Sequence, residues 1–226
     1  MRVVVLAALA SAFVAVLADG PARAQARVGV PTATATGSPA PAAAADKAWS
    51  FYASAYTYVL PDDPNYVQPA IAVDRGWLHL EGRFNYEDLD TGSAWFGYNF
   101  SVGETVTLEI TPMIGAVFGN TTGVAPGYKG SLSWRSLDLS SETEYVFDTT
   151  DSAASFLYTW SELAWAPAEW CRVGAVVQRT KAYETDFDIQ RGFFAGVSYK
   201  RADVTAYVFN PDASRPTGVV ALGLRF

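Results

Sequence analysis

The sequence predicts an all-β protein, a single closed antiparallel transmembrane β-barrel of about twelve strands. Half of the 226 residues are hydrophobic and only 17% are charged, less than the roughly 25% that is usual in soluble domains. After the first 18 residues, the hydrophobic residues never form the block of about 20 that a spanning helix needs, and they alternate with polar ones instead. Because the last expected strand runs to Phe226, we also expect no soluble cap after the barrel.

The alternating segments follow one another from residue 48 onward, and each is about 8–12 residues long. We expect strands over 48–60, 66–73, 77–86, 92–102, 105–118, 127–137, 140–148, 154–165, 169–179, 188–200, 203–210 and 216–226. Their even number is typical of bacterial outer-membrane barrels.

The expected connections alternate between tight and long. The tight ones are Asp74-Arg75-Gly76, Gly103-Glu104, Asp138-Leu139, Pro167-Ala168 and Arg201-Ala202. Most of the others are longer and rich in turn formers, such as 61–65 and 119–126. This pattern is typical of a barrel with short periplasmic turns and longer extracellular loops.

Period-two alternation assigns a face to each side chain. In 77–86, Leu78, Leu80, Phe84 and Tyr86 fall on one face, and His79, Glu81, Arg83 and Asn85 fall on the other. In 92–102 the only misfit is Trp95, which falls on the polar face. Among the apolar faces, Arg179 and Arg191 are the exceptions, and both are near an expected extracellular loop. This alternation predicts lipid outside the barrel and a polar lumen inside.

The N-terminal residues are typical of a signal peptide. Arg2 is followed by an apolar run over 3–17 and by an A-x-A cleavage site at Ala22-Arg23-Ala24. We expect a signal peptide over 1–24, a flexible periplasmic tail rich in Ala, Pro and Thr over 25–47, and the barrel over 48–226. An uncleaved membrane anchor is the alternative. The expected location is the outer membrane of a Gram-negative bacterium.

The final strand carries a second targeting pattern. Val220, Leu222, Leu224 and Phe226 alternate on one face, and this resembles the C-terminal signal read by the outer-membrane assembly machinery. The stretches at 111–113, 118–121, 144–148 and 178–180 are similar to an uncharacterised family of small outer-membrane proteins. That resemblance covers most of residues 50–226. It implies the fold and the location, and it implies no activity.

Polar residues from seven neighbouring strands are expected to form a belt across the lumen. If polar faces pair across each turn, each belt member lies opposite the next. In order, the belt is His79, Asn99, Glu109, Arg135, Glu142, Glu162 and Arg172. Further lumen residues are Glu81, Arg83 and Gln178. The carboxylates of Glu142 and Glu162 would be neighbours, and the flanking Arg135 and Arg172 favour charge compensation over a metal site.

Two functions are compatible with this belt. A charged constriction would select or bind small polar solutes in a narrow channel. A salt-bridge network would instead fill the lumen without any flux, because buried charges have to be paired. Twelve tilted strands would leave a gap of about 10 Å at most, which disfavours a large open porin.

The composition limits partners and cofactors. A net charge of -7 disfavours nucleic acid, and the single cysteine, Cys171, is expected to be a small apolar filler without a disulfide or metal role. No cofactor and no metal are expected. The expected partners are outer-membrane lipid and lipopolysaccharide, the assembly machinery and a small polar solute. Acidic loop residues around 62–63, 87–90 and 184–186 are expected to form a solvated rim.

A lipid-modifying enzyme is a further alternative. His79 is the only histidine, and with Asn99 as an orienting group and Ser101 as a nucleophile it would complete a hydrolytic set. All three are expected to face the lumen, away from membrane lipid. No catalytic residue is therefore assigned.

Overall fold

The computed structural model describes residues 48–61, 63–179 and 189–226, and nearly all of them are strand, turn or loop. The strands are β1 (Ser50–Val59), β2 (Tyr66–Arg75), β3 (Leu78–Phe84), β4 (Thr91–Tyr98), β5 (Phe100–Val102), β6 (Val106–Gly119), β7 (Gly123–Trp134), β8 (Leu137–Asp148), β9 (Phe156–Ala168), β10 (Cys171–Arg179), β11 (Gln190–Tyr199), β12 (Ala202–Phe209) and β13 (Thr217–Arg225). A short 3₁₀ turn, η2 (Ser152–Ala154), lies between β8 and β9. No helix in this part of the chain has the length and apolar character needed to cross a membrane.

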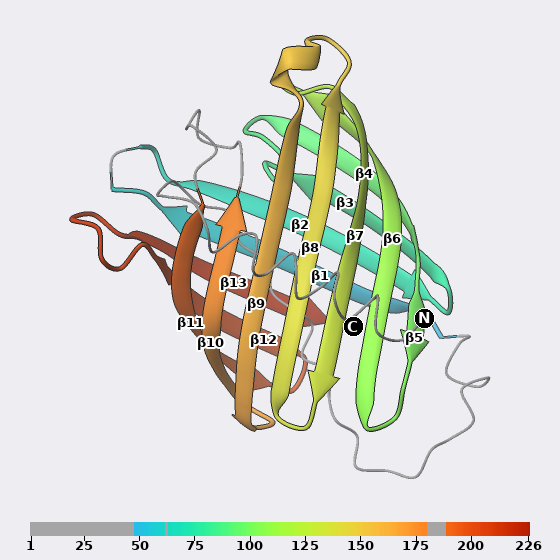
Figure 1. Ribbon diagram of the computed structural model, residues 1–226, viewed down its shortest axis with the longest axis vertical. Coiled ribbons are helices and arrows are strands. Elements are labelled where there is room, and N and C mark those ends of the chain that lie inside the picture. Colours follow the sequence, from blue (N-terminus) through green and yellow to red (C-terminus); the bar gives the residue numbers. More distant parts are fainter. Residues whose placement is uncertain (1–47, 62, 180–188) are drawn as a thin grey trace.

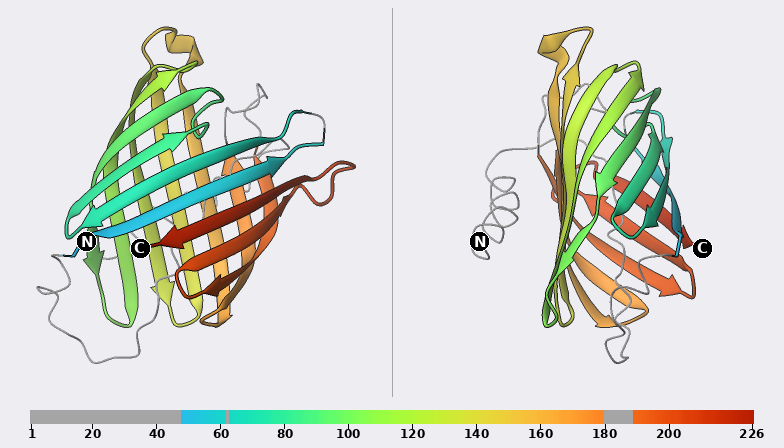
Figure 2. Two further views of the ribbon diagram at one scale, coloured as in Figure 1. Left: turned by 180° about the vertical axis from the view of Figure 1, so that it is seen from behind. Right: turned by 90° about the vertical axis from the view of Figure 1, so that its right-hand side faces the viewer.

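The strands form one closed antiparallel barrel of steeply tilted strands (Figures 1 and 2). β4 and β5 are two parts of one strand, separated only at Asn99, and both pair with β6. The thirteen segments therefore make twelve barrel strands. The first and last strands close the barrel: the backbone N–H groups of Phe51 and Phe226 each donate to the other's carbonyl over 3.1 Å. The predicted fold class and strand number are confirmed.

Every predicted strand is present, although several ends differ. The largest shifts are in the β7–β8 hairpin, because β7 begins at Gly123 rather than 127 and β8 begins at Leu137 rather than 140. The predicted turn at Asp138-Leu139 is wrong. Arg135 and Ser136 make the turn, and Arg135 has a φ of 54°, the left-handed conformation that tight hairpins use. The apolar alternation changes phase between Trp134 and Leu137, at this turn.

The two ends of the barrel differ in their connections. At one end, the turn end, pairs of strands are joined by very short turns such as Gly76-Trp77 and Lys200-Arg201. At the opposite loop end most connections are longer, although the one between β6 and β7 is only Asn120–Thr122. The alternation of tight turns and mostly longer loops is as expected for a barrel.

The outward face is apolar over its whole height. Exposed outward side chains near mid-height include Ile71, Leu80, Phe96 and Leu222, each at least 40% exposed. Five of the seven tryptophans are exposed near the turn end: Trp49, Trp77, Trp134, Trp165 and Trp170. Phenylalanines take the corresponding outward positions near the loop end: Phe84, Phe118, Phe147 and Phe193. Such aromatic bands at both ends of an apolar surface are typical of barrels in a bilayer.

The core lies inside the barrel and fills the half of the lumen nearer the loop end. Its largest fully buried members are aromatic and amide side chains, among them Tyr56, Tyr58, Tyr86, Tyr158, Phe209, Gln68, Gln178 and Gln190. Gln178 lies in the lumen as predicted, where its Nε2 donates to Oε1 of Gln190 over 3.1 Å. This half of the lumen is packed rather than open.

Candidate functional site

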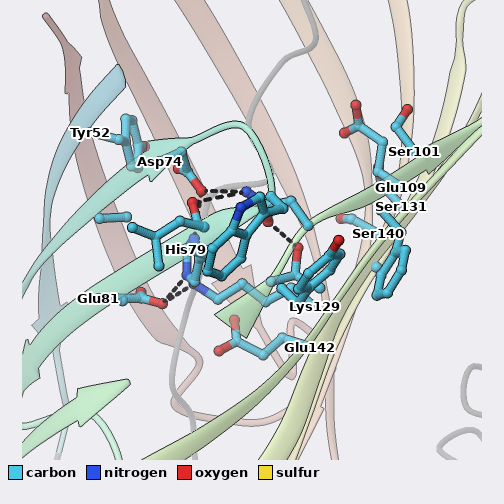
Figure 3. A pocket seen from close by; sticks show the side chains of 18 of the residues that line it. Tyr52, Asp74, His79, Glu81, Ser101, Glu109, Lys129, Ser131, Ser140 and Glu142 are labelled. Atoms are coloured by element: carbon cyan, nitrogen blue, oxygen red, sulfur yellow. Dashed lines mark hydrogen bonds and ion pairs between the residues drawn. The ribbon is translucent and has the colours of Figure 1, made fainter. Parts of the chain in front are cut away.

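A cavity of about 1140 Å³ occupies the lumen toward the turn end, and we call it the vestibule. Gly76 and Trp77 of the β2–β3 turn line its rim, so it reaches the turn end of the barrel. Figure 3 shows its side chains from close by. Two Lys or Arg side chains and five carboxylates line it, and the carboxylates are those of Asp74, Glu81, Glu109, Asp138 and Glu142. The walls therefore carry more negative than positive charge.

One wall of the vestibule is a network of side chains around His79 (Figure 3). His79 Nδ1 lies 2.8 Å from Oδ1 of Asp74, and Nδ2 of Asn99 donates to the same oxygen over 2.8 Å. His79 Nε2 lies 3.3 Å from Oε2 of Glu81, which also forms an ion pair with Lys129. Asn99, His79 and Lys129 therefore direct their donor groups at the two carboxylates of this wall rather than into the cavity.

The Arg83 cluster, which we define as Arg83 with Glu81, Glu87, Glu142 and Glu144, lies at the inner end of the vestibule. Arg83 Nη2 donates to Glu142 over 2.6 Å and to Glu81 over 3.1 Å. Its Nη1 donates to Glu144 over 2.9 Å and to Glu87 over 3.4 Å. The Arg83 side chain has no exposed surface, so one buried guanidinium holds four carboxylates in place. Such an arrangement depends on the guanidinium, because buried carboxylates are costly without a cationic partner.

Part of this cluster comes from a loop rather than from the barrel wall. Tyr86 and Glu87 lie between β3 and β4, yet they are only 1% and 0% exposed. The loop turns inward with positive φ angles of 56° at Asn85 and 50° at Asp90. Ser93 Oγ donates to Oε1 of Glu87 over 2.6 Å and fixes it there. The 85–90 loop therefore inserts two side chains into the lumen.

Two aromatic rings contact the guanidinium. Arg83 Cζ lies 4.3 Å from the ring centroid of Tyr86 and 4.5 Å from that of Trp95, within the range of cation–π contacts. The Tyr158 hydroxyl donates to that of Tyr86 over 3.1 Å. Gly115 makes room for Trp95, since a Cβ at that position would lie 2.5 Å from the indole ring. The misfit Trp95 of the sequence alternation is therefore a lumen residue that packs on the Arg83 cluster.

A second buried ion pair stands on the far side of the lumen. Arg172 Nη1 donates to Oε2 of Glu162 over 2.9 Å, and the Tyr207 hydroxyl donates to Oε1 over 2.9 Å. Trp160 Nε1 also donates to Glu162 over 3.1 Å. Glu162 is 1% exposed and fully partnered, so this group fills and braces the lumen.

The predicted belt residues are only partly brought together. His79, Asn99, Glu109, Glu142, Glu162 and Arg172 are on inward-facing positions. Glu162 and Arg172 form an ion pair, although they do not lie opposite each other as expected. Arg135 is exposed in its turn and does not join them. The predicted Glu142–Glu162 pair is wrong as well, because Trp160 lies opposite Glu142 and Ser140 lies opposite Glu162.

The five other belt registers are also wrong, and Glu142 lies opposite Lys129 rather than Arg135. The structure pairs His79 with Gly97, Glu109 with Ser101 and Ser131, and Glu162 with Val176. Each slip is an even number of residues, which preserves the face of every side chain and changes only its partner. The pairing of β9 with β10 also contains an irregularity between Cys171 and Val173. Cys171 itself is a half-buried free cysteine.

The residues of the hydrolytic alternative do not converge. Asp74, rather than Asn99, contacts the His79 ring. Ser101 is four positions along the chain from Gly97, the residue opposite His79, which corresponds to about 13 Å along a strand. In Figure 3 Ser101 lies beside Glu109, away from His79.

Five lumen residues were not predicted as site residues, namely Lys129, Glu144, Asp74 and the two inserted loop residues. Lys129 and Glu144 share the faces of Arg135 and Glu142, so alternation alone could have placed both in the lumen. Tyr86 was predicted on the lipid face, and this is wrong because the positive φ of Asn85 ends the alternation. Glu87 was expected in a solvated rim and is buried. No sequence signal marks that insertion.

A closed twelve-stranded barrel with an apolar outer face and a packed polar lumen defines the class of small outer-membrane β-barrel proteins. Among solved structures the chain is similar to the KdgM porin, alone and in complex with disordered oligogalacturonate, with a TM-score of 0.57 and 11% identity over 77% of this chain and 99% of that one. It is also similar to Omp33 of Acinetobacter baumannii, with a TM-score of 0.46 and 10% identity over 79% of this chain and 98% of that one. No family model and no curated protein matches the chain.

Proposed function

We propose that this protein is a narrow gated channel of the outer membrane, with the vestibule as its periplasmic entrance and the Arg83 cluster as its gate. The observation that carries the proposal is the vestibule itself: a cavity of about 1140 Å³ ends on a buried charged cluster rather than on a dry apolar core. Part of that cluster is supplied by the 85–90 loop. A loop can withdraw without breaking the strand pairing that holds the barrel together.

The membrane location is supported by the outward surface. The apolar band is bounded by tryptophans at the turn end and phenylalanines at the loop end, which matches the girdles of outer-membrane barrels. Short turns are periplasmic in such barrels. The vestibule then opens to the periplasm and the inserted loop is extracellular.

The ligand named for the similar KdgM structure does not transfer to this vestibule. Oligogalacturonate is a polyanion, and five carboxylates against two Lys or Arg side chains line the vestibule here. Like charges at close range repel, and most strongly where water is scarce. We therefore propose a polar solute that is neutral or cationic.

Removing the inserted side chains tests the gate. We expect Tyr86→Ala with Glu87→Ala to raise single-channel conductance in planar bilayers several-fold, because both side chains leave the lumen while the wall residues stay in place. Asp90→Asn is the matched control: Asp90 is exposed on the same loop, and asparagine tolerates its positive φ of 50°. If the double variant stays silent across salts and voltages, the lumen is a permanent structural plug and the channel proposal is wrong.

The last strand is proposed to be an assembly signal as well as the closing strand. The Phe226 ring stacks on Phe51 with centroids 5.7 Å apart, next to their reciprocal backbone hydrogen bonds. We expect Phe226→Ala to reduce the amount of heat-modifiable barrel in outer membranes and to slow assembly in cells more than refolding in detergent. Phe100→Ala, which removes an equally exposed outward phenylalanine (50% against 54%), is the control. If Phe226→Ala and Phe100→Ala reduce the amount of assembled barrel equally, Phe226 contributes only packing and the assembly-signal proposal is wrong.

A further inference from the structure

The wall of the vestibule formed by β5–β8 carries two carboxylates, Glu109 and Asp138. The nearby Arg172, whose charge acts on Asp138, is itself paired with Glu162. Neither Glu109 nor Asp138 forms an ion pair with any residue that the structure describes. Their nearest polar neighbours are serines: Ser131 lies opposite Glu109, and Ser133 Oγ donates to Asp138 over 2.6 Å. In Figure 3 Glu109, Ser101, Ser131 and Ser140 gather on one side of the pocket. This wall offers acceptors and hydroxyl groups to the cavity.

On the opposite wall, three donors that the structure describes are already directed at acceptors of the protein. Nδ2 of Asn99 is directed at Asp74, and Oγ1 of Thr111 donates to Oδ1 of Asn99 over 2.7 Å. Lys129 is paired with Glu81. Five carboxylates against two Lys or Arg side chains line the vestibule, so a ligand that complements it brings donors and positive charge.

The spacing of the two carboxylates indicates the shape of that ligand. Glu109 and Asp138 are on β6 and β8, with β7 between them, which puts the strands that carry them about 10 Å apart. A single metal ion needs several oxygens within about 2.5 Å of one point. The cavity is large enough for a small organic molecule. Two carboxylates this far apart are better matched by two cationic groups joined by a short chain than by one metal ion.

We propose that the vestibule binds a small organic dication of the diamine class, with one ammonium group at Glu109 and the other at Asp138. The serines of β7 and β8 accept the remaining N–H groups, and the alkyl chain spans the space over β7. This inference deepens the proposed function, since it names the solute class of the same vestibule. It concerns binding in the closed state, so it can be tested without opening the gate.

The test is calorimetric titration of the full-length protein, refolded in detergent at low salt, with 1,4-diaminobutane. We expect saturable binding to the wild type and at least a tenfold weaker affinity for Glu109→Gln with Asp138→Asn. Both replacements keep the side-chain volume, and asparagine can still accept from Ser133. Glu104→Gln, which removes an exposed carboxylate in the β5–β6 turn, should bind as the wild type does. The heat-modified gel mobility of each variant shows that it is folded.

Two further ligands define the class. The neutral analogue 1,4-butanediol should not bind, and calcium chloride at the same ionic strength should not displace the diamine beyond the effect of sodium chloride. Equal affinity of wild type and the double variant, binding of the diol, or specific displacement by calcium would each overturn the proposal. If the diamine binds while Tyr86→Ala with Glu87→Ala stays silent in bilayers, the channel proposal fails and the diamine site remains. If the Tyr86→Ala with Glu87→Ala variant conducts but the wild type does not bind the diamine, the diamine proposal fails and the channel proposal stands.

Discussion

Arg83→Met is expected to destabilise the barrel by about 3–5 kcal/mol, the usual cost of removing one partner from a buried charge pair. Arg83 contacts four carboxylates, and Glu87 and Glu144 are both 0% exposed in their side chains. Without the guanidinium these carboxylates would repel one another in a region with little water. Methionine has a similar length and keeps the aliphatic packing, so the loss reports the charge. Urea unfolding in lipid vesicles, followed by tryptophan fluorescence, measures it.

A compensated variant separates charge from packing. Arg83→Met combined with Glu142→Gln and Glu144→Gln should recover much of the lost stability, because amides can be buried at lower cost than unpaired carboxylates. Glu169→Gln, in an exposed turn, serves as the control substitution. If the free energy of unfolding of Arg83→Met lies within about 1 kcal/mol of the wild-type value, the loss is the size of a surface ion pair. That result would mean that the Arg83 cluster is hydrated and does not close the lumen.

Leu222→Arg is the second large effect, expected at about 2–4 kcal/mol in lipid vesicles, as for a charge at the bilayer midplane. Leu222 is 52% exposed on the outward face of β13 and lies in the middle of the closing sheet, opposite Ala55 and Val204. In the proposed membrane location this surface meets hydrocarbon, where an arginine has no polar partner.

Val106→Arg is the matched comparison for that prediction. Val106 is also outward and 42% exposed, but it begins β6 next to the turn end, where an arginine costs about 0–1 kcal/mol because it reaches the interface. Both variants are unfolded from vesicles and their midpoints compared. A barrel whose outer face met water would tolerate the two arginines equally well, and that result would contradict the membrane assignment.

Strand number and facing could be predicted from the sequence because both depend on local alternation. His79, Glu81 and Arg83 alternate with Leu80 and Phe84 along one strand, and that order alone assigns lumen and lipid faces. Register has no such local signal. Shifting the pairing of two strands by two residues leaves every side chain on its own face. From facing alone, the residue opposite Glu142 could therefore be Lys129 or Arg135, which share a face and a charge. The position of the β7–β8 turn decides for Lys129.

The candidate site required long-range information for the same reason. Glu144 is 61 residues from Arg83 and Glu142 is 59, so no pattern within a strand pairs them. Tyr86 and Glu87 were predicted outside the lumen, and a left-handed residue at Asn85 turns them into it. Such a conformation is accessible to asparagine but not demanded by it.

The sequence by itself determined that the chain forms a barrel, how many strands it has and which side chains within most strands face its lumen, since each follows from alternation, turn residues and chain length. The tertiary structure decided that the lumen is a vestibule closed by Arg83 rather than a continuous charged belt. The physical reason is that a buried charge is stabilised by the partners that reach it in space. Those partners are set by hairpin register and by one inward loop, and neither changes the period-two pattern that the sequence displays.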